Sequence, residues 1–586
     1  MPLRQILGLT PWPVRRRVMR QVELRLLPRV AAGNQLRTAR RVVPLVPRRR
    51  PRPSVAQAPA LRVRTAGARL KARRSSWSDP AAVRRENLDR VVASLESAGL
   101  EWFRIPSESL TRTAVAVLES DRERVLAVLE ALTEAEVGRL VIKGRRATTR
   151  LLRVSWPVTD LAGQVVYGPD YSCEIELWRA VDGRLAAPRP NPVATSIAAD
   201  EPATAAPEPI FGSFGVPGPL ARYRTREIFT MVSPDRVAFP IDAVYTWVDG
   251  DDPNWCERKA RALRDNGWVA GSNGQTANPS RFMSRDELRY SLRSLHAYAP
   301  WIRHVFLVTD DQVPAWLDLD RADLTVVGHR EIFGDTGRLP TFNSQAIESR
   351  LHRIPGLAEH FLYLNDDVFL GRPVAPEMFF TPGGLTRFFP SGARVDPAPR
   401  RPGDTPANSA GKNNRDLIRD TFGRVLTRKM KHTPHPSRRS VLAEIELRFA
   451  DEVKATSEHQ FRHPDDIALL SSLQQYYAYL TGRAAPGEIE YMYTDLADPS
   501  TPFRLARLLH NRNLDAFCLN DTDSAAELVG EQAALLAEFL PAYLPFPSRW
   551  ELDKPRAGTM SPSSTRKPMI ARQATRAHHL AERPHS

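Results

Sequence analysis

The sequence contains little cysteine. Its three cysteines, Cys173, Cys256 and Cys518, lie far apart along a chain of 586 residues. Their spacing matches neither a cysteine-based metal motif nor a framework of disulfide bonds. Few and scattered cysteines are typical of proteins that work in a reducing compartment. We therefore expect a cytoplasmic protein.

Long apolar runs are also missing. The sequence has no segment of the roughly 18 consecutive apolar residues that a membrane-spanning helix requires. No apolar stretch follows the first basic residues, as it would in a secretory signal. The sequence thus predicts neither a transmembrane helix nor a signal peptide.

Three loops that mark common enzyme classes are absent as well. The sequence contains no Gly-x-x-x-x-Gly-Lys phosphate loop, no Gly-x-Gly-x-x-Gly after a predicted strand and no Gly-x-Ser-x-Gly elbow. These absences argue against P-loop NTPases, Rossmann-type dehydrogenases and serine hydrolases.

Positive charge, in contrast, is abundant and unevenly placed. Residues 1–75 hold 20 Arg and Lys side chains and one acid, Glu23, so the rest of the chain is near neutral although the total is +16. Many prolines disfavour helix here, and we predict a disordered basic arm over residues 1–76. Its interleaved Leu and Arg can also contact an anionic membrane. A nucleic-acid tail is a third interpretation, although Trp12 is the arm's one aromatic residue.

Composition divides the rest of the chain into four predicted parts. They are a small α/β accessory domain (77–180), a Pro/Ala-rich linker (181–235), a large α/β domain (236–552) and a disordered tail (553–586). The accessory domain begins with a helix whose start is marked by Asp79-Pro80. We interpret Glu174 and Glu176 in this domain as a solvated strand face.

The large domain alternates predicted strands with predicted helices. The predicted strands are 241–248, 304–308, 324–327 and 361–364. A polar loop follows each strand, and the pattern turns helical beyond residue 410. This order predicts an α/β fold with a Rossmann-like, mostly parallel sheet and added C-terminal helices. Ser284 and Glu287 fit a capping box at the start of one helix.

The stretch Phe361-Leu-Tyr-Leu-Asn-Asp-Asp-Val-Phe-Leu370 joins an apolar strand to adjacent acids. Its apolar beginning is typical of a strand buried on both faces, as in a parallel sheet. Asp366 and Asp367 follow directly, and ionised carboxylates are costly there unless they are paired or bind a metal. Because open α/β sheets bind ligands at this edge, the pattern predicts a cation site. An Asp-rich turn is the plainer alternative.

Two further predicted strands end in acids in the same way. Asp249, Asp251 and Asp252 follow the first, and Asp310 and Asp311 follow the second. Converging carboxylates repel one another unless cations neutralise them. Oxygen ligands without a nearby Cys or His favour Mg²⁺, with Mn²⁺ or Ca²⁺ as alternatives. We therefore predict a divalent-cation site for phosphorylated substrates, in which Asp252 and Asp311 are only turn formers.

Basic residues near these acids are candidates for phosphate binding. Arg289, two residues after Glu287, can clamp a diphosphate, or it can form an ordinary surface pair on its helix. His432 and Arg462 lie on predicted loops, where the His432-Thr-Pro-His435 turn suits a positioned general base. Loop histidines are also common as plain surface groups.

Together these residues resemble the four conserved blocks of the Stealth proteins, in order and spacing, between Asp242 and Ser548. The matching stretches are Asp242-Ala-Val-Tyr-Thr-Trp-Val-Asp-Gly-Asp-Asp-Pro-Asn-Trp255, Glu287-Leu-Arg-Tyr-Ser-Leu-Arg-Ser294, Leu339-Pro-Thr-Phe-Asn-Ser344, Tyr363-Leu-Asn-Asp-Asp367, His432-Thr-Pro-His435, Arg462-His463 and Phe517-Cys-Leu-Asn-Asp521. The segment Met283-Ser284-Arg285 departs from the family pattern, and we do not assign it a substrate contact.

Stealth proteins are bacterial capsule and exopolysaccharide phosphotransferases, related to the α/β subunits of animal N-acetylglucosamine-1-phosphotransferase. The resemblance implies transfer of a sugar 1-phosphate from a UDP-sugar to a glycan hydroxyl, with release of UMP. It also implies a catalytic domain similar to the GT-A glycosyltransferase arrangement and a need for a divalent cation.

The resemblance further implies roles for individual residues. Asp366 and Asp367 would bind the metal or activate the hydroxyl, His432 would be a base or phosphate ligand, and Arg462 would be a phosphate clamp. The other implied substrate-binding residues are Asp249, Glu287, Arg289, Asp310, Asn365, Asn520 and Asp521.

Two rival functions are left open at this point. A metal-dependent glycosyltransferase of the same fold would attack the anomeric carbon of the donor sugar and release UDP. A basic nucleic-acid-binding or scaffold protein would act through residues 1–75, and we expect no specific nucleic-acid partner because the large domain gathers acids.

Overall fold

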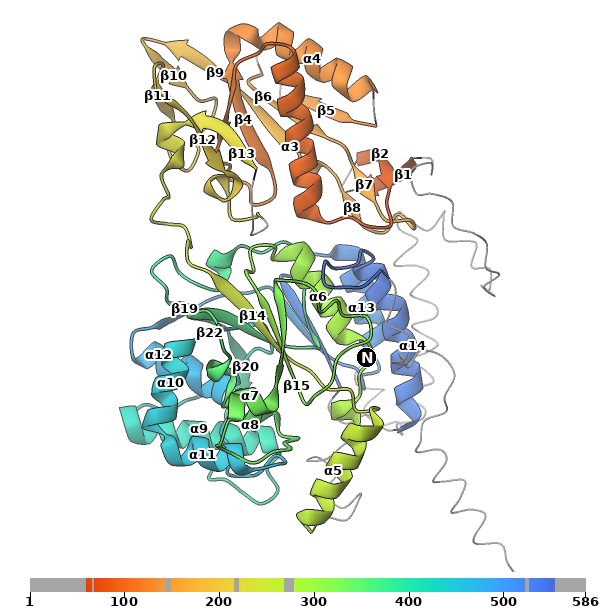
Figure 1. Cartoon of the computed structure of the whole chain (residues 1–586), viewed down its shortest axis with the longest axis vertical. Coiled ribbons are helices and arrows are strands. Elements are labelled where there is room, and N and C mark those ends of the chain that lie inside the picture. Colours follow the sequence, from red (N-terminus) through yellow and green to blue (C-terminus); the bar gives the residue numbers. More distant parts are fainter. Residues whose placement is uncertain are drawn as a thin grey trace, which may run out of the picture.

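The structure is a computed structural model that describes residues 60–553, except 66–67, 136, 143–148, 216–220, 268–278 and 522–525. Two lobes follow one another along the chain (Figure 1). Most of the predicted basic arm and nearly all of the predicted tail lie outside the described residues. No helix within the described ranges is both long enough and apolar enough to cross a membrane.

The N-terminal lobe is built on a nine-stranded sheet whose central order is β11-β10-β9-β4-β3-β13-β12, with α3 and α4 packed together beside it (Figure 1). Its helices are α3 (Pro80–Ser97) and α4 (Arg122–Ala135), and its strands are β1 (Leu61–Thr65), β2 (Ala68–Arg74), β3 (Trp102–Ile105), β4 (Thr113–Leu118), β5 (Arg139–Ile142), β6 (Leu151–Ser155), β7 (Val158–Thr159), β8 (Val166–Tyr167), β9 (Cys173–Val181), β10 (Arg184–Ala186), β11 (Ser196–Ala198), β12 (Ala203–Pro207) and β13 (Arg222–Arg226). Asp79 caps α3 by accepting a hydrogen bond from the amide of Ala82, as its sequence predicts.

The prediction of a linker over 181–235 is wrong, because β10 to β13 complete this sheet. β11 and β12 lie at two edges of the sheet, where short strands and a proline such as Pro207 are tolerated. Such strands bury few side chains, so they leave little hydrophobic periodicity in the sequence. The predicted basic arm is also too long, because β1 and β2 lie within it and β2 pairs with β7.

Glu174 and Glu176 are buried on β9, so the prediction of a solvated face is wrong. Arg153 donates to Glu174 at 2.6 Å, and Arg189 donates to Glu176 at 2.7 Å. Arg189 comes from the supposed linker. The two acids therefore form ion pairs that tie this segment to the centre of the sheet.

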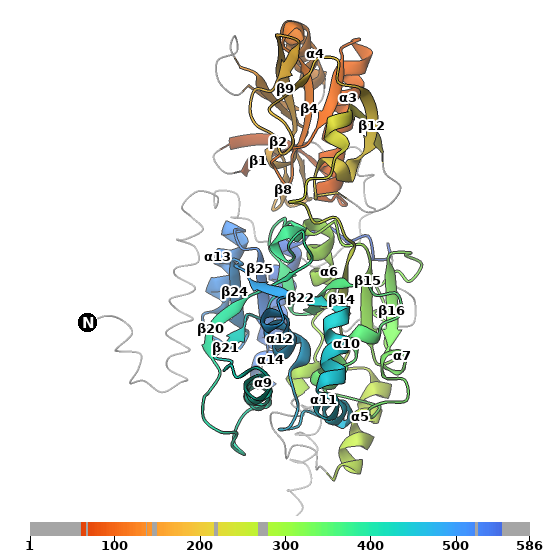
Figure 2. The ribbon, with the colours of Figure 1, turned by 90° about the vertical axis from the view of Figure 1, so that its left-hand side faces the viewer.

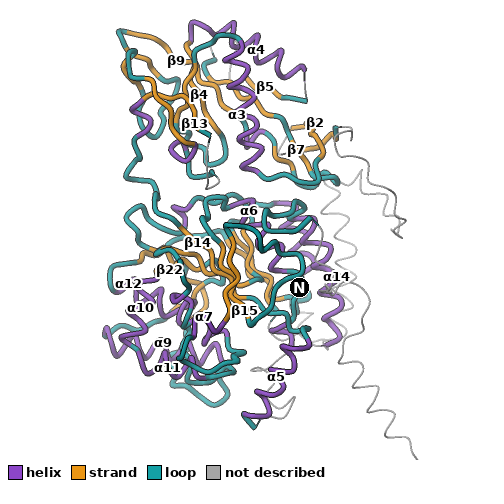
Figure 3. Tube along the Cα trace, viewed as in Figure 1, coloured by secondary structure: helices purple, strands orange, loops and turns teal. Residues whose placement is uncertain are grey.

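The second lobe contains a five-stranded sheet in the order β16-β15-β14-β17-β22. Figure 3 shows strands in the middle of this lobe with helices around them. Its strands are β14 (Ile241–Thr246), β15 (Val305–Thr309), β16 (Leu324–Gly328), β17 (His360–Asn365) and β22 (His435–Arg438). The first four are parallel and β22 is antiparallel to β17. This confirms the predicted α/β fold with a mostly parallel sheet.

Both faces of this sheet are covered. Along β17, Leu362 and Leu364 belong to one apolar core, and Phe361 and Tyr363 belong to another on the opposite face. The helices of this lobe are α5 (Pro253–Asp265), α6 (Glu287–Tyr298), α7 (His329–Phe333), α8 (Ser344–Glu348), α9 (Pro406–Phe422), α10 (Arg439–Arg448), α11 (Ala450–Glu458), α12 (Gln474–Leu480), α13 (Thr501–Asn511) and α14 (Ala526–Tyr543). The predicted helices beyond residue 410 are confirmed, although the short strand β22 comes directly before α10.

Smaller sheets extend the lobe. A three-stranded sheet in the order β18-β25-β24 continues from the end of β17 (Figure 2). Its strands are β18 (Val368–Leu370), β24 (Tyr491–Asp495) and β25 (Ala516–Asn520), and the two short pairs are β19 (Thr386–Phe388) with β23 (Ala484–Pro486) and β20 (Pro390–Arg394) with β21 (Arg428–Met430). β25 reaches this position from the C-terminal part of the chain, so it brings distant residues beside Asp367.

Glu446 on α10 links this helix to the turn after α8. It forms ion pairs with Arg350 and Arg353 and lies 2.6 Å from the Nε2 atom of His352. Burial alone would raise the pKa of Glu446, but the hydrogen bonds from His352 and Arg353 lower it from 4.5 to about 2.

We therefore expect Glu446→Gln to destabilise the protein in a pH-dependent way. A carboxylate whose pKa is lowered in the folded state stabilises the fold when the pH is above its pKa in the unfolded chain. This contribution disappears as the pH falls toward about 2, the pKa in the folded state. The melting temperature of the variant should be below that of the wild type at pH 7, and the difference should shrink below pH 4.5. A difference that is constant with pH would contradict this role.

Candidate active site

The carboxyl ends of β14 and β17 form the centre of the candidate site. In chain order the parallel strands lie 3-2-1-4 across the sheet, so the order reverses between β14 and β17. Doubly wound sheets bind ligands at such a switch point, outside the carboxyl ends of the strands. Asp366 and Asp367 follow β17 at this point, and Asp249 follows β14.

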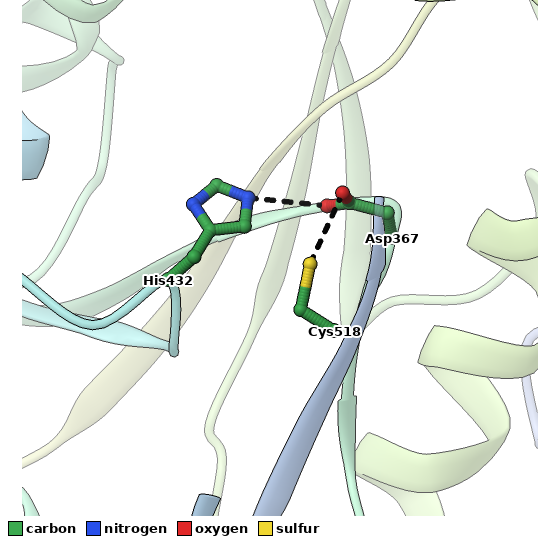
Figure 4. A group of neighbouring side chains, drawn as sticks. All are labelled: Asp367, His432 and Cys518. Atoms are coloured by element: carbon green, nitrogen blue, oxygen red, sulfur yellow. Dashed lines mark hydrogen bonds and ion pairs between the residues drawn. The ribbon is translucent and has the colours of Figure 1, made fainter. Parts of the chain in front are cut away.

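Asp367 is the most connected of the predicted acids (Figure 4). Its Oδ1 atom lies 3.3 Å from Nε2 of His432. Its Oδ2 atom accepts a hydrogen bond from the Cys518 thiol at 3.3 Å. The same atom accepts another from Nδ2 of Asn520 at 3.0 Å. Four residues from three distant segments therefore meet at one carboxylate.

Strand pairing explains this meeting. β22 runs antiparallel to β17 with Tyr363 opposite His435, so the residues before β22, including His432, lie beside the residues after β17. β25 runs antiparallel to β18 with Val368 opposite Cys518. Neither pairing leaves a local pattern in the sequence, and Cys518 was therefore missed as a site residue.

The surroundings of Asp366 disfavour its ionised form. Burial raises the pKa of Asp366 well above its ordinary value, and the neighbouring charges of Asp367 and Glu287 raise it further. Burial likewise raises the pKa of Glu287, with a further contribution from Asp367. This accumulation of acids favours a bound cation or a shared proton.

Arg285 opposes these acids. It forms an ion pair with Asp521 and lies 3.7 Å from Glu287, whose carboxylate also accepts a hydrogen bond from the Arg285 amide. Glu287 is thus the first residue of α6, and Asp286 precedes it with a φ of 66°. The predicted capping box at Ser284 is wrong, because the helix begins three residues later. We assigned no substrate contact to the segment Met283-Ser284-Arg285, although Arg285 lies beside Glu287 and Asp521 at the candidate site.

Arg462 approaches the site beside His432. Its Nη2 atom donates to the Ser344 hydroxyl at 2.9 Å, where Asn343 caps α8. Glu348 lies one turn along α8, and burial raises its pKa while the charges of Arg462 and His432 oppose this rise. Burial lowers the pKa of His432, but Asp367 and Glu348 outweigh it and leave the pKa raised. Our prediction from the sequence did not include Glu348. Its position one turn after the Asn343 cap was the signal that could have indicated it.

Three predicted substrate-binding residues have other partners. Asp310 accepts from Arg258 at 2.8 Å. Among the residues that the structure describes, Arg289 pairs with Glu551 at 2.6 Å and with Asp286, and neither belongs to the Asp367 cluster. Asp249 forms a turn in which its amide donates to Gln312 at 3.0 Å, and burial raises its pKa. The structure therefore does not bring Asp310 or Arg289 into contact with Asp367.

The residues around Asp367 fit a divalent cation. Asp367, His432 and Cys518 offer an oxygen, a nitrogen and a sulfur atom within 4.8 Å of one another, and Asp366 adjoins them in sequence. The premise that no His or Cys lies near these acids is wrong in the folded chain. Burial and Asp367 raise the pKa of Cys518 well above its ordinary value, so its thiol is a hydrogen-bond donor here. The carboxylates suit Mg²⁺ or Mn²⁺, whereas an imidazole and a sulfur atom beside them also suit transition metals such as Zn²⁺.

The four conserved regions of the Stealth protein family match the chain at 239–267, 281–388, 431–479 and 506–562. Asp249 lies in the first region, Asp367 in the second, His432 in the third and Cys518 in the fourth. An exopolysaccharide phosphotransferase of Streptomyces coelicolor is 46% identical over 495 residues, which cover 80% of this chain and 83% of that protein. This chain belongs to the Stealth family.

A second relative, the exopolysaccharide phosphotransferase CpsY of Mycobacterium tuberculosis, is 37% identical over 388 residues, covering 66% of this chain and 70% of its own. Among solved structures, the galactosyltransferase LgtC matches 50% of this chain and 95% of its own at 11% identity and a TM-score of 0.26. A TM-score this low does not bear on function. Three of the matched regions lie far apart in sequence but supply the residues of one cluster around Asp367, so the family match and the geometry point to the same site.

Proposed function

We propose that this Stealth protein transfers a sugar 1-phosphate from a UDP-sugar to a hydroxyl group of a glycan, in the synthesis of a cell-surface or capsular polysaccharide. The products are a phosphodiester and UMP. The observation that carries this proposal is the Asp367 cluster, in which acids for a cation face His432 and Arg462 at the switch point of the sheet. The names of the Stealth relatives agree with a phosphotransferase.

In this proposal the residues of the cluster divide the work. Asp366 and Asp367 hold the divalent cation, which would stabilise charge on the transferred phosphate when bound. His432 accepts the proton of the attacking hydroxyl or binds a phosphate oxygen, and its contact with Asp367 orients the ring. Arg462 binds the phosphate through its planar guanidinium. Asn365, Asn520 and Asp521 close the site, and the nucleotide lies toward Asp249, Glu287, Arg289 and Asp310.

The proposed reaction balances simply. The acceptor oxygen attacks the β-phosphorus of the UDP-sugar, and the bond from that phosphorus to the bridging oxygen of UMP breaks. UMP leaves with both electrons, and the proton of the hydroxyl passes to the protein. We place this reaction in the cytoplasm, with the basic residues that precede β1 as a contact to the anionic inner face of the plasma membrane.

Product analysis tests this proposal. The full-length protein would be incubated with UDP-sugars and glycan fragments, and nucleotides would be separated by chromatography. We expect UMP together with a phosphodiester resonance on the glycan in ³¹P NMR. Release of UDP with no phosphorus on the glycan would instead assign a glycosyltransferase reaction.

Removal of the cation should abolish the reaction. We expect EDTA to reduce UMP release to background, and Mg²⁺ or Mn²⁺ to restore it, because the clustered acids otherwise repel a diphosphate. Far-UV circular dichroism at the assay temperature with and without EDTA serves as control, since the fold should persist although loss of a bound cation lowers the melting temperature. Full activity after dialysis against EDTA would contradict the role of Asp366 and Asp367 as ligands.

A further inference from the structure

A pair of tyrosines on β24 flanks the Asp367 cluster. β24 runs parallel to β25 with Tyr493 beside Cys518 and Tyr491 beside Ala516 (Figure 2). Paired residues of neighbouring strands point to the same face of a sheet. Because Cys518 and Asn520 use that face to contact Asp367, both tyrosines lie on the face that carries the cluster.

The opposite face of this small sheet is ordinary core. Met492 pairs with Phe517, and the Phe517 ring stacks on Phe369 at 5.0 Å. Met492 and Tyr491 are both partly buried against this core, and Tyr493 is the exposed ring on the side of Cys518. Tyr493 is 39% exposed, whereas Tyr491 is partly buried near the backbone of His432. An accessible aromatic ring therefore stands at the rim of the site and a second ring lies deeper.

The distance between the rim and the cluster suits one sugar ring. Neighbouring strands lie about 4.8 Å apart, so Tyr493 stands one strand away from Cys518, which contacts Asp367. Burial raises the pKa of both tyrosines, and the charge of Asp367 adds to the rise in each. Both hydroxyls therefore stay protonated at neutral pH and can donate hydrogen bonds.

The position of β24 relative to the conserved regions indicates which substrate it meets. The third Stealth region ends at residue 479 and the fourth begins at 506, so β24 lies between them. The residues that contact Asp367 lie inside the conserved regions. A part of the site that lies outside the conserved regions is suited to bind the substrate that differs between family members. If the members share the transfer reaction, the substrate that differs is the acceptor.

We propose that Tyr493 and Tyr491 form the acceptor subsite, in which the apolar face of a neutral pyranose ring stacks on Tyr493 and one hydroxyl of that sugar reaches Asp367. This assignment rests on the proposed phosphotransferase function. Aromatic rings with a few polar groups are the usual lining of small-molecule sites, and a tyrosine ring offers both. Tyr491 positions the same sugar from the deeper side.

Equilibrium binding tests the subsite without requiring turnover. The full-length wild type, Tyr493→Ala and Tyr493→Phe would be applied to a panel of immobilised neutral hexose and N-acetylhexosamine oligosaccharides. The affinity for UDP would be measured on the same samples by calorimetry. We expect Tyr493→Ala to weaken binding of the recognised oligosaccharide about tenfold, the size of one stacking contact, while the UDP affinity stays within twofold. Tyr493→Phe should keep most of the affinity because it keeps the ring.

Tyr479→Ala is the matched control, because Tyr479 is an exposed tyrosine on α12 whose ring contacts Phe388. It should bind like the wild type. Loss of UDP affinity in Tyr493→Ala would assign the ring to the nucleotide and overturn the acceptor subsite, as would a wild type that binds no neutral oligosaccharide. Because these readouts involve no transfer, they separate failure of the subsite from failure of the proposed reaction.

Discussion

Asp367→Asn is expected to lower kcat/KM for sugar-phosphate transfer by about 10³-fold or more while the protein remains folded. The substitution keeps the size of the side chain and removes its charge. The variant therefore lacks the negative partner of His432 and the proposed carboxylate ligand of the cation. A loss of this size is typical of groups that act on the charge of a transition state.

The stability of this variant makes the prediction sharper. Asp367 lies beside Asp366 and Glu287, and the charge of Asp367 contributes to the raised pKa of both. Removing one charge relieves this repulsion, so the melting temperature of Asp367→Asn in EDTA should equal or exceed that of the wild type. A variant that is inactive because it unfolds would melt earlier, which would contradict the prediction.

Asp311→Asn provides a control at the same edge of the sheet. Asp311 is exposed and has a φ of 58°, a left-handed conformation that Asn tolerates as well as Asp does. We expect this variant to keep activity within about twofold, since no role beyond turn formation is assigned to it. Equal losses in Asp311→Asn and Asp367→Asn would show a general effect of charge at this edge.

The sequence was sufficient to predict the strand at the centre of the candidate site. An apolar strand that ends in Asp366 and Asp367 predicts a buried parallel strand with a polar carboxyl end, and the structure has β17 there with a core on each face. Long-range pairing could not be predicted in this way. His432 reaches Asp367 through the antiparallel pairing of β22, and Cys518 through that of β25.

The errors in the N-terminal lobe have the same physical origin. Edge strands such as β12 bury few side chains, so a Pro- and Ala-containing segment resembles a linker although it completes a sheet. Glu174 and Glu176 alternate like a solvated face, yet distant arginines bury them. In each case the deciding partner lies far away in sequence.

Arg462→Lys is expected to lower kcat/KM by about 10²-fold. Lysine keeps the positive charge but loses the planar pair of N–H groups that holds two phosphate oxygens together. Arg462 is oriented by the Ser344 hydroxyl at 2.9 Å, so Ser344→Ala should cost a smaller, about tenfold, loss. The loop around Arg462 is held by contacts other than the one to Ser344. Asp466 on this loop accepts a hydrogen bond from Asn343 at 2.8 Å and lies 2.7 Å from His459.

This separate anchoring allows the role of Arg462 to be distinguished from a structural one. Asp466 is buried and holds the loop through Asn343 and His459, whereas Arg462 donates to Ser344 and lies near the charges of Glu348 and Asp466. Arg462→Lys should therefore leave the melting temperature nearly unchanged while the activity falls. Arg400→Lys, at the exposed ion pair with Asp465 on the same loop, is the matched control and should keep activity. If both lysine variants lose activity equally, the loop and not the Arg462 guanidinium supports the reaction.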